Sequence, residues 1–317
     1  MTEVQKWQIS SEQDGQRLDN YLLSRLKGAP RTLVYRIIRS GEVRVNRGRV
    51  RPEYRVKDGD EIRIPPLRLA QRDDTPLHLG ADFSRHLNER IIYEADGLIV
   101  LDKPQGMAVH GGSGIQLGVI EAMRSLRPNY RFLELVHRID RDTSGLLLMA
   151  YQRSALLKAQ EALRQGSVVK KYQAILNGTM LQPKVYVEHP LHKYNLASGE
   201  MRVRVDVQGK PAQSEFERIW SRQGLTGASV RIFTGRTHQI RVHALSQGMP
   251  IVGDEKYGAK VPGPLWQRQG FRRLFLHAAT LELPWQDGMM TFEAPLDGAM
   301  QELWDKGLHN QLDDLIQ

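Results

Sequence analysis

The stretch LELVHRIDRDTSGLLLMAY, residues 133–151, places charged side chains between two apolar runs. Carboxylates beside a core strand are costly to bury unless they are paired. The segment Asp142-Thr-Ser-Gly is typical of a turn, and it predicts that the chain enters a buried strand at GLLLMA, residues 145–150. Asp140 lies one step further from that turn, beside Arg138, so the turn does not explain it. We therefore treat Asp140 as a candidate functional carboxylate.

Three other interpretations of this segment fail on spacing. A calcium-binding loop that began at Asp140 would need a bidentate acid at its twelfth position, which is Tyr151. HRID is similar to a protein-kinase catalytic loop, but no DFG follows it and no glycine-rich phosphate loop precedes it. A zinc hydrolase would need three ligands, whereas His238 and His243 are five residues apart and no HExxH is present. We therefore expect neither a metal site nor kinase chemistry.

The composition narrows the class of protein. With 317 residues, 40% of them hydrophobic, the chain is long enough for two domains with real cores. A net charge of +9 favours a polyanionic partner, nucleic acid first. No apolar run approaches the length of a spanning helix, and MTEVQKWQIS has no signal-peptide core, so we expect a cytoplasmic protein without a membrane partner. The absence of cysteine excludes disulfides, thiolate nucleophiles and cysteine-based zinc sites.

Strand patterns dominate from residue 89 onward. IIYEADGLIVLDKP predicts a hairpin around an Asp-Gly turn, and RSALLKAQEALRQG predicts a helix that ends at glycine. Further alternating runs follow: VVKKYQAIL, MRVRVDV, SEFERIW, ASVRIF and LFLHAATLEL. Many strands with few helices predict an α+β domain, residues 89–317, with a large mixed, mainly antiparallel sheet. Residues 76–88 lack sustained periodicity and are predicted to be linker.

Two segments of this domain offer partners for Asp140. In VVKKYQAIL, alternation places Lys170 and Tyr172 on one face of a strand, where the tyrosine is either core or a surface on which a base stacks. In FTGRTHQIRVHALSQG, Thr237 is predicted to be the N-cap of a helix, so Arg236 lies just before the helix N-terminus. The helix dipole slightly disfavours a cation there. We therefore expect an anion beside Arg236, either Asp140 or an RNA phosphate.

Residues 14–75 are predicted to form a separate, small and basic unit. Leucines four residues apart predict one helix, and Pro30 and Gly41 bound a second. Residues 14–64 hold 13 lysines and arginines against 7 acidic residues, a net charge of +6. Exposed arginines between the apolar positions would bind phosphates: Arg31, Arg36, Arg39, Arg44, Arg47 and Arg49. The order of QRLDNYL, the arginine-rich helix and VRVN resembles an S4 RNA-binding domain.

The motifs of the second domain resemble those of the RluA family of pseudouridine synthases. HRIDRDTSG matches the aspartate motif, KKY the lysine-x-tyrosine motif and GRTHQIRVH the third signature, while LFLHAATLEL and LDKPQGMAVH also fit. With the S4-like unit, the likeness covers nearly the whole chain. It implies the pseudouridine synthase fold and an isomerase that detaches a uridine at its N1–C1′ bond, rotates the base and rejoins it through C5. No cofactor is implied.

The resemblance also implies roles for individual residues. Asp140 is the essential catalytic residue, Arg236 its ion-pair partner, and Tyr172 stacks on the target base and is a candidate base for the C5 proton. The resemblance also places Arg138 near the flipped-out nucleotide and packs Leu276 in the site. Together with Lys170 and the six arginines of the S4-like unit, these are the residues that we expect to contact RNA. Attack of Asp140 on C1′ and abstraction of a ribose proton to give a glycal remain open.

The expected partner is 23S ribosomal RNA or a precursor of the large ribosomal subunit, bound by a monomer. A non-catalytic RNA-binding or ribosome-assembly protein is the alternative, because the basic S4-like unit alone would suffice for that role. A metal-dependent nuclease is a third. Loss of function on Asp140→Asn separates the first from the second, and inhibition by EDTA identifies the third.

Overall fold

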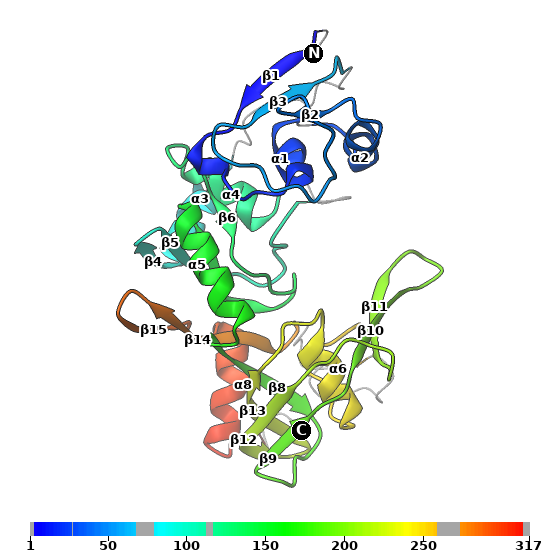
Figure 1. Ribbon diagram of the computed structural model, residues 1–317. Coiled ribbons are helices and arrows are strands. Elements are labelled where there is room, and N and C mark those ends of the chain that lie inside the picture. The colour runs from blue at the N-terminus through cyan, green and yellow to red at the C-terminus, as the bar shows by residue number, and fades with distance from the viewer. Residues whose placement is uncertain (1–2, 27, 68–78, 112–116, 259–272, 313–317) are drawn as a thin grey trace. The chain divides into compact units, whose positions relative to one another are not determined.

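The computed structural model describes residues 3–26, 28–67, 79–111, 117–258 and 273–312. The chain divides into two compact units, residues 1–76 and 77–317 (Figure 1). Each unit has its own hydrophobic core. No helix among the described residues is long and apolar enough to cross a membrane.

The first unit packs two helices against a three-stranded antiparallel sheet of order β1-β3-β2. Its elements are β1 (Gln5–Gln8), the short 3-10 helix η1 (Ser11–Gln13), α1 (Leu18–Arg25), α2 (Arg31–Arg39), β2 (Arg44–Val45) and β3 (Glu61–Ile64). Leu18, Leu22 and Leu26 are fully buried, as their spacing predicts. The helix–helix–strand order is the one that the sequence predicts, and β1 lies ahead of residue 14.

The second unit is built on a ten-stranded sheet. Its helices are α3 (Ala81–Glu89), α4 (Val119–Leu126), α5 (Arg153–Arg164), α6 (Gln239–Ser246) and α8 (Gly298–Leu308). Its strands are β4 (Ile91–Ala95), β5 (Leu98–Lys103), β6 (Glu134–Leu135), β7 (Ser144–Ala150), β8 (Val169–Asn177), β9 (Lys184–Val187), β10 (Leu191–Asn195), β11 (Met201–Val205), β12 (Ser214–Arg222), β13 (Leu225–Ile232), β14 (Leu276–Trp285) and β15 (Gly288–Glu293).

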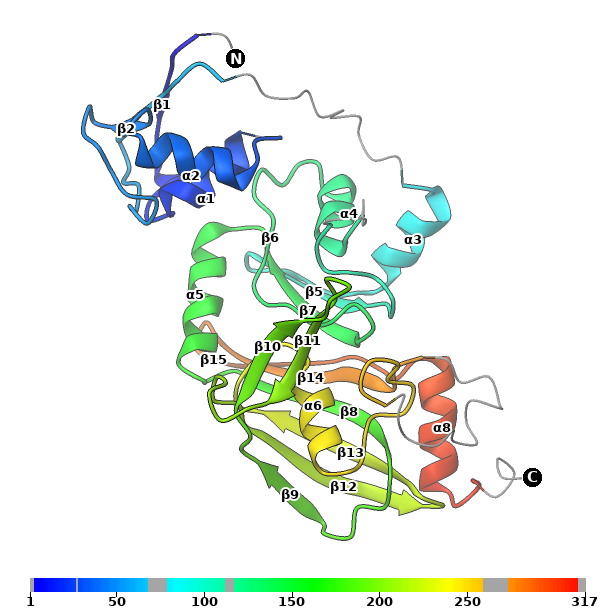
Figure 2. The ribbon, with the colours of Figure 1, turned by 90° about the vertical axis from the view of Figure 1, so that its right-hand side faces the viewer.

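The sheet is mixed and mainly antiparallel, which confirms the predicted fold class. Its main path runs β4-β5-β7-β14-β8-β13-β12-β9, with β15 paired to β14 and β6 to β7. The pairing of β7 with β14 is parallel, and the other pairings are antiparallel. The hairpin β10–β11 and α6 lie on one face of this sheet and α8 on the other (Figures 1 and 2).

Residues 76–88 differ from the linker that their sequence predicts. Residues 81–88 of this segment belong to α3, and Leu87 is buried in the core of the second unit. The sequence signal is weak because Phe83 and Leu87 are the main apolar contacts of a helix that is otherwise polar. Residues 76–78 lie outside the described part of the chain.

Gly145 brings the opening segment close to β14. Its φ is +98°, a conformation that glycine adopts readily, and a Cβ atom there would lie 2.3 Å from the carbonyl oxygen of Ala278. The Thr143 amide donates to the Asp140 carbonyl at 3.3 Å, so Asp140 starts the turn that leads into β7. The turn thus runs from Asp140 to Thr143, earlier than the predicted Asp142-Thr-Ser-Gly turn, because Ser144 and Gly145 already belong to β7.

Replacement of Gly145 by alanine tests this contact. We expect Gly145→Ala to lower the free energy of unfolding by at least about 2 kcal/mol more than Gly106→Ala, measured by urea denaturation. Gly106 is the matched control because its φ is +79° and a Cβ atom there meets nothing within 4 Å. Equal losses in the two variants would show that backbone strain, and not the contact with β14, limits residue 145.

A buried histidine of β14, His277, joins the start of β7 to the residue that follows β15. Ser144 Oγ lies 2.8 Å from His277 Nδ1, and His277 Nε2 lies 3.1 Å from the Ala294 carbonyl. Arg273 donates to the same Ser144 oxygen at 2.8 Å, so the serine hydroxyl donates onward to Nδ1. Burial lowers the pKa of His277 to about 4. The imidazole is therefore neutral in the folded protein at neutral pH.

This pKa predicts acid sensitivity. Between pH 6.5 and 4 the unfolded chain binds a proton at residue 277 before the folded protein does, so stability falls as the pH falls through this window. At pH 5 this one histidine costs about 2 kcal/mol relative to pH 7. We expect the loss of unfolding free energy from pH 7 to 5 to be smaller by about that amount in His277→Gln, measured by urea denaturation. An unchanged loss would contradict the assignment.

Candidate active site

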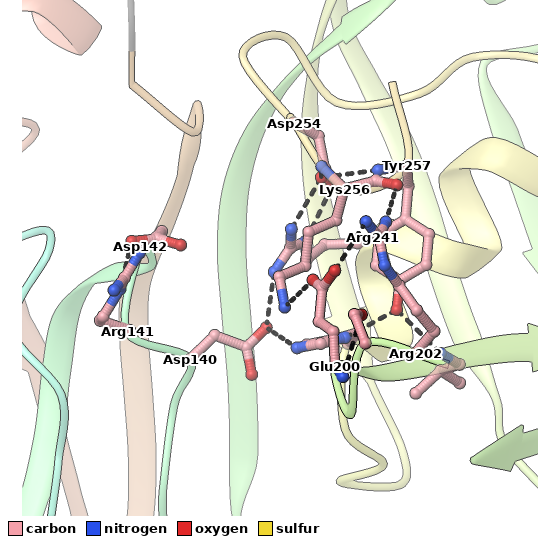
Figure 3. A network of polar contacts seen from close by, with 12 residues as sticks. Asp140, Arg141, Asp142, Glu200, Arg202, Arg241, Asp254, Lys256 and Tyr257 are labelled. Carbon is pink, nitrogen blue, oxygen red and sulfur yellow. Dashed lines mark hydrogen bonds and ion pairs between the residues drawn. The ribbon is translucent and has the colours of Figure 1, made fainter. Parts of the chain in front are cut away.

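Asp140 lies at the start of the turn before β7, and its carboxylate points to a cluster of charged groups (Figure 3). Arg241 Nη1 lies 3.5 Å from Asp140 Oδ2, and His238 Nε2 lies 3.9 Å from the same oxygen. The Asp140 side chain is 20% exposed, so one part of the carboxylate remains open to a ligand. Asp142 points the other way and pairs with its neighbour Arg141 at 3.1 Å.

Arg241 is held by a second carboxylate behind it. Its Nε and Nη2 atoms each donate to Asp254 at 2.7 Å, a two-pronged contact between side chains that are 3% and 0% exposed. The backbone amides of Lys256 and Tyr257 donate to the same carboxylate at 3.0 Å. The guanidinium is thus fixed in orientation before any substrate binds, with Nη1 left for Asp140.

The expected pairing of Arg236 with Asp140 is wrong. Arg236 is exposed, and its Nε atom donates to the Pro211 carbonyl at 3.0 Å. The helix begins at Gln239 and its cap is His238, not Thr237, so Arg236 lies on an outward turn. Arg241, in the first turn of α6, is the arginine beside Asp140.

A signal for Arg241 is present in the sequence. The predicted helix buries Ala244, and residue 241 precedes it by three positions, on the same face. An arginine between Ile240 and Val242 on a buried face must have a carboxylate partner.

Tyr172 and Leu276 share one face of the sheet, as the β8–β14 register shows. Tyr172 pairs with Ala278, and Leu276 pairs with Ala174, two residues further along the same face. Gly145 is in turn the partner of Ala278 on β7, which brings the Asp140 turn next to this face. Burial, reinforced by the negative charge of Asp140, raises the pKa of the Tyr172 phenol, so the hydroxyl is protonated at neutral pH.

The other residues of this unit that are predicted to contact RNA differ in their exposure to solvent. Lys170 is half-buried on β8, and desolvation lowers its pKa. Arg138 is exposed, two residues before Asp140. His137, between the two apolar runs of this motif, accepts a hydrogen bond from the Leu148 amide at Nε2, and burial lowers its pKa to about 4. This contact anchors the segment that presents Arg138 to solvent.

Lys103 is a buried residue of the site that the sequence did not reveal. Its ammonium group donates to three main-chain carbonyls, those of Pro104, Met107 and Arg141, at 2.8–2.9 Å. The contact with Arg141 anchors the turn beside Asp140. Burial lowers the pKa of Lys103 to about 7, although Asp142 and Asp140 oppose this shift. The three carbonyl acceptors match the three protons of the charged form.

In the first unit, all six predicted phosphate-binding arginines are exposed. The outward face of α2 lines an open groove of about 810 Å³, formed by Arg31, Thr32, Tyr35, Arg36, Arg39 and Ser40. Arg39 lies over the Tyr35 ring, 5.6 Å from its centroid. Arg47 lies at the tip of the β-turn before Gly48 with a φ of +66°, and the side chain of Asn46 secures this turn to Asp60 at 2.7 Å.

Comparison with known proteins agrees with this arrangement. The family described as RNA pseudouridylate synthase matches residues 97–246, and the S4 domain family matches residues 16–62. A Yersinia pestis protein named ribosomal large subunit pseudouridine synthase C is 48% identical over 300 residues, 94% of each chain. The chain belongs to the RluA family of pseudouridine synthases. It is therefore an enzyme, an RNA pseudouridine isomerase with an S4 domain.

Two further relatives support the same family. A Haemophilus influenzae protein of the same name is 48% identical over 302 residues, which cover 94% of this chain and 93% of that one. Among solved structures, human RNA pseudouridylate synthase domain containing 4 superposes with a TM-score of 0.60 at 26% identity, over 72% of this chain and 95% of that one. The predicted pseudouridine synthase fold is confirmed.

Proposed function

We propose that this enzyme converts uridines of 23S ribosomal RNA to pseudouridine with Asp140 as its catalytic residue. The choice of substrate rests on the 48% identity, over 94% of the chain, to proteins named for the large ribosomal subunit. The S4 domain and its exposed arginines suit an RNA of this size. The partner is the RNA itself or a precursor of the large subunit, met in the cytoplasm by a monomeric enzyme.

The reaction breaks the N1–C1′ bond, forms a C5–C1′ bond, and moves one proton from C5 to N1 by way of solvent or side chains. Nothing is oxidised and no atom is gained or lost, so we propose that neither a cofactor nor a metal takes part. Asp140 in its ionised form can attack C1′, or it can remove a ribose proton to give a glycal. In both routes Arg241 pairs with the reacting carboxylate, since its Nη1 atom lies 3.5 Å from Asp140 Oδ2.

Tyr172 and Leu276 would form the surface on which the extruded uracil rests. Their shared face of the sheet next to the Asp140 turn supports this assignment, and a ring–base stack offsets part of the cost of extrusion. Because the Tyr172 phenol is protonated in the free enzyme, it would relay the C5 proton by passing its own proton to water. Arg138 and Lys170 would contact the nucleotide and its phosphates.

The arginines of α2 would hold RNA through its phosphates. We expect Arg36→Gln/Arg39→Gln to weaken binding to a 23S rRNA fragment by about 10-fold and to reduce the slope of log affinity against log salt by about 2. Filter binding at several salt concentrations measures both quantities. Lys6→Gln/Lys57→Gln is the matched control, because it removes two charges of the same unit outside the groove. Equal losses in both variants would count against a phosphate site on α2.

Tritium release tests the function directly. Transcripts of 23S rRNA that carry [5-³H]uridine lose label to water when the C5 proton leaves. We expect release by the wild-type enzyme, and pseudouridine at the same positions in rRNA from cells with the gene and not in rRNA from cells without it. Isomerisation of another RNA, with 23S rRNA untouched, would reject the proposed substrate and keep the enzyme class.

A further inference from the structure

The imidazole of His238 lies between Tyr257 and Asp140. Its Nδ1 atom is 2.7 Å from the Tyr257 hydroxyl, and its Nε2 atom is 3.9 Å from Asp140 Oδ2. The side chain is only 9% exposed. His238 is thus the second polar group, after Arg241, that faces this carboxylate oxygen.

The hydrogen bonds behind His238 determine where its proton lies. The Val203 amide of the hairpin β10–β11 donates to the Tyr257 hydroxyl oxygen at 3.0 Å. Among the described residues, the other partner of that hydroxyl is His238 Nδ1, so the phenol donates its proton there. A neutral imidazole whose Nδ1 accepts must carry its hydrogen on Nε2.

The electrostatics at the Nε2 side of the ring, which faces Asp140, favour the same tautomer. An Nε2–H points a positive dipole at the Asp140 carboxylate, whereas an Nε2 lone pair would face a negative charge. Burial lowers the pKa of His238 to about 4 against the opposing pull of Asp140, and Arg241 and Lys256 act in the same direction as burial. The ring is therefore a neutral donor at neutral pH.

His238 holds a backbone conformation that disfavours most side chains. Its φ and ψ are +52° and +22°, in the left-handed region, and its side chain makes no hydrogen bond that caps α6. Strained residues of this kind persist where the surrounding structure holds them, often at functional sites. This backbone conformation directs the ring from the N-terminus of α6 toward Asp140, and the side chain does not cap the helix.

We infer that His238 is a positioning residue, which donates from Nε2 to Asp140 Oδ2 and leaves Oδ1 as the oxygen that reacts with the ribose. This inference rests on the proposed catalytic role of Asp140. Both contacts of Asp140 meet the same oxygen, and the other oxygen is free of them in Figure 3. The 3.9 Å separation shortens when substrate excludes water, as catalytic contacts do in many ligand-free enzymes. The hairpin supports the catalytic carboxylate through Val203 and Tyr257.

Two amide variants separate positioning from mere structural support. In His238→Gln the side-chain amide can reach the place of Nε2 and donate to Asp140. In His238→Asn the amide reaches only the place of Nδ1, but asparagine tolerates the left-handed conformation better than glutamine. We therefore expect His238→Asn to be the more stable variant and His238→Gln the more active one. A structural role predicts that activity follows stability.

The readouts are the single-turnover rate of pseudouridine formation, the affinity for the rRNA fragment and the melting temperature. We expect His238→Asn to lower the rate about 10- to 100-fold with RNA affinity unchanged, and His238→Gln to restore most of the rate. Asparagine activity equal to wild type, or activities of both variants in the order of their melting temperatures, would overturn the inference.

Nitrogen NMR of ¹⁵N-histidine-labelled full-length enzyme tests the tautomer without any turnover. We expect His238 to show a protonated Nε2 and an unprotonated Nδ1 at pH 7, and to lose this preference in Tyr257→Phe. A protonated Nδ1 in the wild type would overturn the inference even if the enzyme is active. Absence of tritium release by the wild-type enzyme, with the expected tautomer present, would instead reject the proposed function and with it the role of His238 in catalysis.

Discussion

Asp140→Asn is expected to lower pseudouridine formation by at least about 10³-fold, equivalent to about 4 kcal/mol of transition-state stabilisation. An amide is neither the nucleophile nor the base that the two chemical routes require. The fold should survive, because Arg241 keeps its two contacts with Asp254. Single-turnover tritium release with excess enzyme measures the rate independently of product release.

Asp142→Asn is the matched control for this prediction. It makes the same chemical change two residues away, at a side chain that is 31% exposed and paired with its neighbour Arg141. A pair with one exposed and one half-buried partner contributes little, so we expect its rate to stay within about 10-fold of the wild type. The assignment of Asp140 is wrong if both variants lose activity equally, or if Asp140→Asn retains a rate near that of the wild type.

Arg241→Met is expected to have the largest effect on stability, a loss of about 3–5 kcal/mol in the free energy of unfolding. It leaves the fully buried Asp254 carboxylate with backbone donors but no cation, and it removes the charge beside Asp140. Urea denaturation measures the loss. The double variant Arg241→Met/Asp254→Asn should recover part of it, because the unpaired buried charge is then gone as well.

Arg236→Met is the control that the sequence itself supplies, since the third motif contains both arginines. Arg236 is exposed and donates to one main-chain carbonyl, so its loss should change stability by no more than about 0.5 kcal/mol. A loss as large as that of Arg241→Met would contradict the structural difference between the two side chains.

The sequence pattern led to Arg236, and not Arg241, as the partner of Asp140, which shows the limit of such prediction in this motif. Thr237 is a good capping residue by type, but the cap is His238, one residue later, in a left-handed conformation. A shift of that size turns a helical side chain to another face, because each residue rotates by about 100° around the axis. The order of residues in the motif was therefore insufficient to decide which guanidinium points inward.

The sequence by itself predicted the two units, the strand-rich α+β class and a turn ahead of the strand GLLLMA, and it made Asp140 a candidate functional residue. These features depend on apolar periodicity and turn residues, which act over a few neighbouring positions. The tertiary structure alone decided that Arg241 and His238 face Asp140, that Lys103 anchors its turn, and that Asp254 stands behind the arginine. These contacts join separate elements of the fold, and they depend on strand register and helix rotation, which no local pattern encodes.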